Sequence, residues 1–95
     1  MAIKTHKFDA ARYLKLTEAQ VELLNDALES HNAAYIANAL GVIARTRGIS
    51  NLSRSTGLSR EGLYKALSKK GDPQLSTLLA VLRSLGFSLT AKKAA

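Results

Sequence analysis

The segment GLSREGLYKALS, residues 57–68, constrains the fold of this chain more than any other stretch. Gly57 ends one short helical pattern, and Ser59 has the character of an N-cap for the next one. Only Leu58 and Ser59 separate that glycine from the second helix. A left-handed glycine in so tight a turn sets two helices at a steep angle. The sequence therefore predicts a helix-turn-helix at residues 50–68.

The residues around the turn meet the packing requirements of such a motif. Ser53, four residues before Gly57, is small enough to let the two helices touch. Apolar residues flank the turn and underlie the second helix: Leu52, Leu58, Leu63 and Leu67. An ordinary αα-hairpin with a solvated polar face is the alternative interpretation of the same pattern.

The outward face of the second helix is polar and mixed in charge. Helical spacing turns Leu63, Ala66 and Leu67 inward, so another set must face out: Arg60, Glu61, Tyr64, Lys65 and Ser68. Arginine and lysine donate to guanine, glutamate accepts from cytosine, and hydroxyls donate to phosphate. We therefore interpret this face as a surface that contacts double-stranded DNA in the major groove. Gly62, inside the helix, allows two interpretations: close approach to a phosphate or a neighbouring helix, or sequence drift.

The charge of the chain is unevenly distributed. The 95 residues carry a net charge of +7 and are long enough for a single domain, residues 1–95. Residues 1–43 hold four Lys or Arg and five Asp or Glu, a net of −1, whereas residues 44–95 hold ten and two, a net of +8. A basic half suits a polyanionic partner, although a gain in solubility alone explains it equally well.

The rest of the chain is predicted to be helical. Asp9 is expected to cap a short helix over residues 10–15, and Thr17 to open a second one in a capping box with Gln20. Val21, Leu24 and Leu28 would share its apolar face. Asn32 caps a predicted helix over 33–47, and Gly48 ends it.

Three further elements complete the predicted fold. Ser50 is expected to cap a short helix that Gly57 closes, and the helix that Ser59 opens is expected to run to Gly71. Leucines at helical spacing predict an amphipathic helix over 75–85, ending at Gly86. The segment FSLTA, residues 87–91, alternates as a short strand does. The expected fold class is all-α, with about five to six helices and a possible short C-terminal strand.

The segment from "ALGVIARTRG" through "GLSREGLYKALS" to "VLRSLGFSL" resembles the addiction module antidote proteins, or HigA-like antitoxins, of the lambda-repressor-like (XRE) helix-turn-helix family. The resemblance runs from about Phe8 to Leu89. It implies a type II antitoxin that binds a RelE/ParE-like toxin and represses the shared operon. It also assigns the recognition helix to Ser59, Arg60, Glu61, Tyr64 and Lys65, and phosphate contacts of the preceding helix to Ser50 and Arg54.

The N-terminal half contains the candidate toxin-binding residues. Phe8, Tyr13 and Leu14 either pack an N-terminal arm on the core or join a toxin-binding surface with Glu18, Glu22 and Asp26, since RelE-like toxins are usually basic. The acids, which extend to Glu29, are alternatively a solvated helix face.

The sequence predicts a homodimer, because one short recognition helix reads only a few base pairs. Leu82, Phe87 and Leu89 are the candidate interface residues; alternatively, Phe87 and Leu89 cap the core of the monomer. Two rival functions stay open: a repressor with no toxin partner, and a helical interaction domain that never contacts DNA.

Other chemistry is not expected. The chain has no cysteine and only two histidines, His6 and His31, which we interpret as exposed bystanders rather than metal ligands. No arrangement typical of a catalytic triad or a carboxylate pair occurs, so we expect neither an enzyme nor a cofactor. No apolar run approaches the roughly 18 residues of a membrane helix, and a cytoplasmic location is expected.

Overall fold

The computed structural model describes residues 2–94, and their side chains from Leu16 onward. This part of the chain contains five α-helices and no strand: α1 (Ala2–Glu29), α2 (Ala33–Arg47), α3 (Ile49–Thr56), α4 (Arg60–Ala66) and α5 (Leu75–Leu85). The predicted all-α class is confirmed over these residues. The predicted strand over 87–91 is wrong, because the segment after Gly86 runs extended and no second strand lies beside it to pair with.

The N-terminal region forms one long helix where the sequence predicted two. Both the helix expected over residues 10–15 and the one expected from Thr17 lie inside α1. No proline or glycine occurs between Ala2 and Glu29, so nothing interrupts the ladder of backbone hydrogen bonds. Gln20 is therefore not part of a capping box at a helix start; its side chain accepts a hydrogen bond from Arg47 instead.

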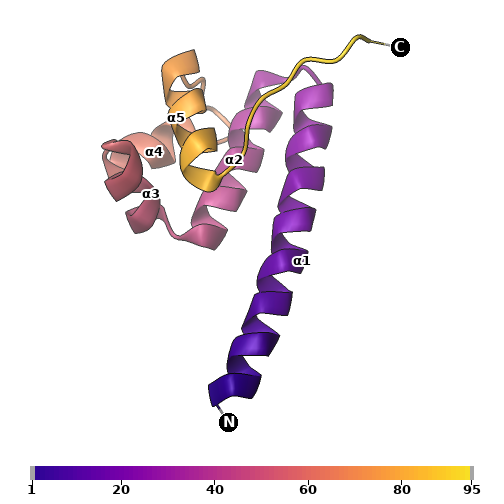
Figure 1. Cartoon of the computed structure of the whole chain (residues 1–95). Coiled ribbons are helices and arrows are strands. Elements are labelled where there is room, and N and C mark those ends of the chain that lie inside the picture. Colours follow the sequence, from indigo (N-terminus) through magenta and orange to yellow (C-terminus); the bar gives the residue numbers. More distant parts are fainter. Residues whose placement is uncertain (1, 95) are drawn as a thin grey trace.

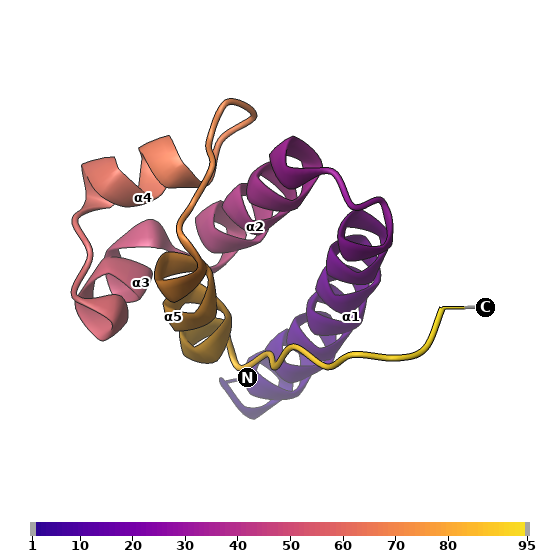
Figure 2. The same cartoon turned by 90° about the horizontal axis from the view of Figure 1, so that it is seen from above.

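The hydrophobic core lies between α2 and the short helices, with α1 on the outside. α2 packs against α1, α3 and α4, and α3 packs against α4 and α5. Figures 1 and 2 show α3 and α4 at one end of the molecule and α1 at the other, with α2 and α5 between them. The fully buried side chains with the largest volumes are those of Leu40, Ile43, Leu63, Leu67 and Val81.

Several predicted helix ends are confirmed. The side chain of Asn32 caps α2 by accepting a hydrogen bond from Tyr35 N at 3.1 Å, and Gly48 follows the last residue of that helix. Ser50, however, is not a cap: it is the second residue of α3, which follows Gly48 directly and has no side-chain cap. α4 also ends earlier than predicted, at Ala66, because residues 67–70 leave the helix in a turn in which Gly71 N donates to Ser68 O.

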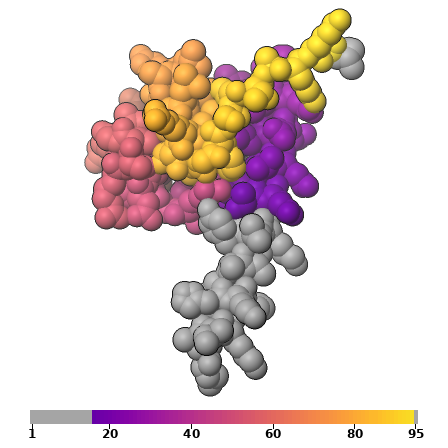
Figure 3. All heavy atoms as spheres, in the orientation of Figure 1, coloured from indigo at the N-terminus to yellow at the C-terminus, as the bar shows by residue number. Residues whose placement is uncertain are grey.

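The C-terminal segment folds back toward α1. α5 ends at Gly86, as predicted, and Phe87 N then donates to Leu82 O at 2.9 Å. Figure 3 shows the following residues lying on the surface between α5 and the C-terminal part of α1. Lys92 Nζ lies 3.4 Å from Glu29 Oε1 there, in an exposed ion pair. Among the described residues, no helix is long and apolar enough to cross a membrane.

Candidate functional site

The turn between α3 and α4 has the geometry that the sequence predicts. Gly57 adopts φ +75°, a left-handed conformation that favours glycine, and its N–H donates to Ser53 O at 2.9 Å. Ser53 Oγ donates to Leu58 O across the turn. Leu58 packs on the core, and Leu63 and Leu67 are buried beneath α4. The turn is thus fixed on both sides, and the orientation of α4 follows from it.

Ser59 caps α4, and Gly62 leaves room for that cap. Ser59 Oγ accepts a hydrogen bond from Gly62 N at 2.9 Å. A Cβ at position 62 would lie only 2.9 Å from the same oxygen, so a larger residue would have to displace the capping hydroxyl. This is a local structural reason for Gly62, in addition to the two interpretations that the sequence allowed.

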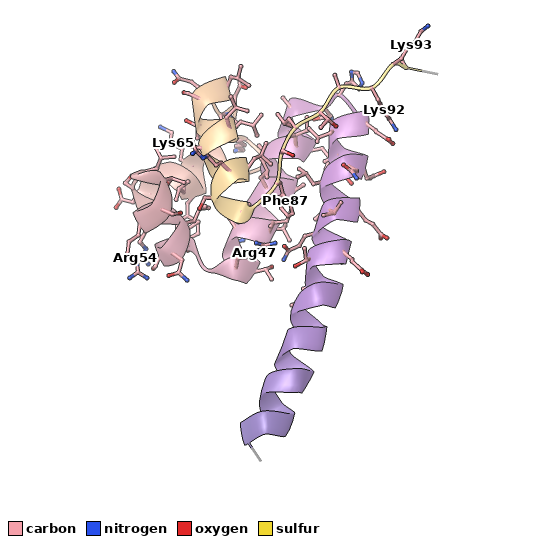
Figure 4. The ribbon with its side chains drawn as sticks, viewed as in Figure 1. Arg47, Arg54, Lys65, Phe87, Lys92 and Lys93 are labelled. Atoms are coloured by element: carbon pink, nitrogen blue, oxygen red, sulfur yellow. The ribbon has the colours of Figure 1, made fainter. Side chains whose placement is uncertain are left out.

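The predicted DNA-contacting side chains gather on the outside of α3 and α4. The set consists of Ser50, Arg54, Ser59, Arg60, Glu61, Tyr64 and Lys65, all exposed, with Ser68 partly buried. Tyr64 keeps 44% of its surface exposed although it is aromatic. Within residues 16–94, whose side chains are described, none of the cations in this set is paired with a carboxylate. Figure 4 shows Arg54 and Lys65 at this end of the molecule. Arg54 donates to Asn51 Oδ1 within α3 and Ser68 Oγ donates to Lys65 O, but no carboxylate among the described side chains neutralises the cations of this set.

Arg47, at the C-terminus of α2, holds three segments of the chain together. Its Nε donates to Gln20 Oε1 of α1 at 2.8 Å, and its Nη1 donates to Leu85 O at the end of α5 at 2.8 Å. The guanidinium also lies over the ring of Phe87, 5.2 Å from the centroid, in a cation–π contact (Figure 4). Gly48 and α3 follow directly. Nothing in the local sequence pattern predicts these contacts, because they join segments that are distant along the chain.

Gly41, in the middle of α2, allows the end of α4 to approach very closely. A Cβ built at position 41 would lie 2.0 Å from the carbonyl oxygen of Leu67 and 3.1 Å from its carbonyl carbon. Gly41 is buried, and Ala37 and Ala44 on the same helix are also buried. α4 is therefore held against α2 at a backbone contact that any side chain would prevent. A glycine inside an apolar helix pattern was the available sequence signal.

The outward face of α1 is acidic. Glu18, Glu22, Asp26 and Glu29 are all exposed and lie at helical spacing on one stripe, and residues 16–43 contain no lysine or arginine. The hydroxyl of Tyr35 in α2 donates to Asp26 Oδ2. This hydrogen bond, with minor contributions from desolvation and from the charge of Asp26, raises the pKa of Tyr35 above its ordinary value of 10.0. Phe8, Tyr13 and Leu14, the apolar candidates for toxin binding, lie outside the residues whose side chains are described.

The candidate dimer residues have different surroundings. Leu82 is only 2% exposed and belongs to the core of the monomer, so the prediction that its side chain contacts a second subunit is wrong. Phe87 is partly buried against the core and Arg47, which agrees with the alternative that it caps the monomer. Leu89 is 39% exposed. In α5, Leu75 and Leu79 belong to the apolar stripe of the predicted amphipathic helix, but their side chains are 66% and 47% exposed.

The described residues offer little for chemistry or for a metal. No group of three or more His, Cys, Asp or Glu side chains among them is arranged to hold a metal ion. An open groove of about 820 Å³ lies between the C-terminal segment and the end of α1, and is lined by residues that include Asn25, Leu28 and Thr90. The concentration of exposed donors on α3 and α4 is thus the more specific feature.

Comparison with known proteins identifies relatives along nearly the whole chain. Residues 4–93 match a protein family described as "Probable addiction module antidote protein". A Haemophilus influenzae protein with the name "Uncharacterized protein" is 46% identical over 79 residues, which represent 82% of this chain and 80% of the relative. No solved structure is significantly similar to the chain.

Proposed function

This chain belongs to the family of probable addiction module antidote proteins, and on that premise we propose that it is the antitoxin of a type II toxin–antitoxin pair. It neutralises a RelE/ParE-like toxin by direct binding, and it represses its own operon as a DNA-binding dimer. It has no catalysis or cofactor of its own and acts in the cytoplasm. The family match supports the antitoxin role; the exposed donors on α3 and α4 support DNA binding.

The DNA-binding unit in this proposal is α3, the turn and α4, within a lambda-repressor-like (XRE) helix-turn-helix domain of the HigA-like type. α4 enters the major groove, where Arg60, Glu61 and Lys65 meet base edges. Arg54 is exposed on α3, outside the helix that enters the groove, so in this proposal it contacts phosphate. The turn fixed by Gly57 and Ser53 keeps α4 pre-oriented for binding.

The toxin-binding surface in this proposal is the acidic stripe of α1. Four carboxylates and no cations within residues 16–43 suit a basic partner, whereas the basic half of the chain suits DNA. Since α1 packs against α2 and stands away from α3 and α4, the toxin and the DNA are assigned to separate faces (Figure 2).

Co-expression with the toxin that this proposal expects a neighbouring gene to encode tests the function as a whole. We expect the chain to restore growth, to co-purify with that protein, and to shift DNA from upstream of the gene in a gel. DNA binding without growth rescue would favour a repressor that has no toxin partner. If the chain binds neither DNA nor the toxin, the remaining interpretation is a helical interaction domain that does not contact DNA.

Sequence readout gives the first residue-level prediction. Arg60→Ala should cost about 1–3 kcal/mol of binding free energy and flatten the base preference at one position, because it removes a base contact. Arg54→Ala, the matched change on α3, should lower the affinity for all DNA sequences by a similar factor. Binding to a library of operator variants measures both effects. An unchanged preference and affinity in Arg60→Ala would contradict the assignment of α4 as the reading helix.

Reversing charge on α1 gives the second prediction. Glu18→Lys combined with Glu22→Lys should lower toxin affinity at least about tenfold, because like charges then face a basic partner. The control is Glu61→Lys with Asp72→Lys, which changes the net charge equally but lies away from α1. Toxin affinity is measured by titration calorimetry, and DNA affinity by gel shift. If the α1 variant binds the toxin normally, the toxin site lies elsewhere on the chain.

A further inference from the structure

The C-terminal segment, residues 87–94, is firmly held only at its start. Phe87 is partly buried against the core, its N–H donates to Leu82 O, and its ring lies against the guanidinium of Arg47. Residues 88–94 are all exposed, and their backbone groups make no hydrogen bond to another residue of the described chain. The segment runs extended over the surface toward the C-terminal end of α1 (Figure 3). Beyond Phe87, side chains alone hold it in place.

A single ion pair joins the far end of the C-terminal segment to α1. Lys92 Nζ lies 3.4 Å from Glu29 Oε1, and the two side chains are 84% and 67% exposed. Figure 4 shows Lys92 beside the C-terminal end of α1. Within residues 16–94, whose side chains are described, this is the only ion pair. A pair so exposed changes an equilibrium constant by about fivefold at most, and salt screens it. The contact is therefore weak enough to be exchanged for another.

An open groove of about 820 Å³ separates the C-terminal segment from α1. It is lined on one side by Asn25, Leu28, Glu29 and His31, and on the other side by residues 90–94. Because the groove is open, the segment spans it rather than packing down on the helix. Little apolar surface is buried between the two, so lifting the segment away from α1 loses little hydrophobic stabilisation.

Glu29 is also the last carboxylate of the acidic stripe on α1. Residues 16–43 contain no lysine or arginine, so Lys92 is a cation that the chain brings to this stripe from a distant segment. A basic partner seated along the stripe would place its own cations beside the same carboxylates. We propose that the C-terminal segment is a displaceable strap: Lys92 occupies the Glu29 end of the stripe in the free chain, and a basic partner lifts it. That this partner is a toxin rests on the proposed function.

The strap lowers the affinity of the chain for a basic partner. Only the fraction of molecules in which Lys92 has left Glu29 presents the whole stripe, and the apparent affinity falls by that fraction. Removing the strap should therefore tighten binding. A segment that itself contacted the partner would give the opposite result, since its removal would weaken binding. The sign of the change thus separates the two roles.

A spin label on the segment tests the strap in the free chain. The chain has no cysteine, so Ala94→Cys accepts a single nitroxide label. The label should broaden the amide signals of residues 25–29 at low salt. Lys92→Gln should restore these signals, as should about 1 M salt, where the screening length is only about 3 Å. A synthetic decalysine peptide should restore them at low salt, whereas a Gly-Ser peptide of the same length should not.

Toxin affinity measured by titration calorimetry tests the consequence. Lys92→Gln, and a chain that ends at Leu89, should each bind the toxin about two- to fivefold more tightly than the wild type. Lys93→Gln is the matched control, because it removes the same charge but no ion pair in the described structure; it should bind as the wild type does. In a Glu29→Gln background, Lys92→Gln should have no further effect. Circular dichroism melts show that each variant is folded.

The outcomes separate failure of the strap from failure of the proposed function. Weaker toxin binding by the chain that ends at Leu89 would overturn the strap and make the segment a contact surface instead. Unbroadened signals of residues 25–29 in the free chain, or signals that decalysine leaves broadened, would overturn it as well. If no toxin binds any variant, the proposed function fails, and the label with decalysine still decides whether a basic ligand lifts the segment.

Discussion

Gly41→Ala should lower the free energy of unfolding by about 3 kcal/mol, the upper end of the usual range for overpacked cores. The new Cβ would lie 2.0 Å from the carbonyl oxygen of Leu67, far inside van der Waals contact. The obstacle is backbone at the end of α4, so no side-chain rotation relieves the clash. α2 and α4 must move apart, which opens the core around Leu63 and Leu67. For a domain of this size, the melting temperature should fall by about 15 °C.

The comparison variant for this prediction is Gly62→Ala, the same chemical change in an exposed helix. There the helix gains about 0.5–1 kcal/mol from losing a glycine, and crowding of the Ser59 cap removes a similar amount. Its melting temperature should therefore change by only a few degrees. If Gly41→Ala melts within that same small range, the close approach of α4 to α2 is wrong. Thermal melts followed by circular dichroism measure both variants.

DNA affinity should fall by about a thousandfold when the salt concentration rises from about 50 to 200 mM. Each neutralised phosphate contributes about −0.9 to the slope of log affinity against log salt, and a dimer that contacts about six phosphates gives a slope near −5. The exposed cations of each subunit in reach of the backbone include Arg54, Lys65 and the adjacent Lys69. The slope follows from fluorescence anisotropy at several salt concentrations.

Lys69→Gln tests whether one cation near α4 contributes to the salt dependence of DNA affinity. Removing one phosphate contact from each subunit should make the slope of the dimer shallower by about 2, with no change in base preference. Lys92→Gln, on the C-terminal segment beside Glu29, should leave the slope unchanged. Figure 4 shows Lys92 far from Arg54 and Lys65. An affinity that does not vary with salt would contradict an electrostatic contact with DNA altogether.

Local signals account for the parts of the fold that the sequence predicted well. Asn32, Gly57 and Ser59 define helix ends through hydrogen bonds within three or four residues, so their effect is readable from neighbouring positions. Helical spacing placed Leu63 and Leu67 in the core and the polar side chains of α4 outside. The same signals wrongly predicted a helix start at Thr17, which lies inside α1. A residue suited to a helix start does not interrupt a helix that contains no glycine or proline.

Contacts between distant segments account for the parts that could not be predicted. The bond from Arg47 to Gln20 joins residues 27 positions apart, and the close approach at Gly41 involves Leu67 in another helix. Apolar spacing likewise gave no sign that Leu75 and Leu79 lack a covering neighbour, since exposure depends on where the other helices end. The exposure of the polar face of α4 depends only on the spacing within that helix and on its turn, so this part could be predicted from neighbouring residues.

Because α1 packs on α2, away from α3 and α4, the proposed function gives the chain two partner surfaces on different faces. A protein held on the outer face of α1 leaves α4 uncovered, and DNA on α4 leaves the acidic stripe uncovered (Figure 2). The proposed function therefore allows a ternary assembly of DNA, this chain and a toxin. Arg47 donates hydrogen bonds to Gln20 of α1 and to Leu85 O at the end of α5, and Gly48, the next residue, leads into α3. The two proposed binding surfaces are therefore connected through the contacts of Arg47. If both proposed partners bind, their relative supply, rather than competition for a shared surface, should set which assemblies form.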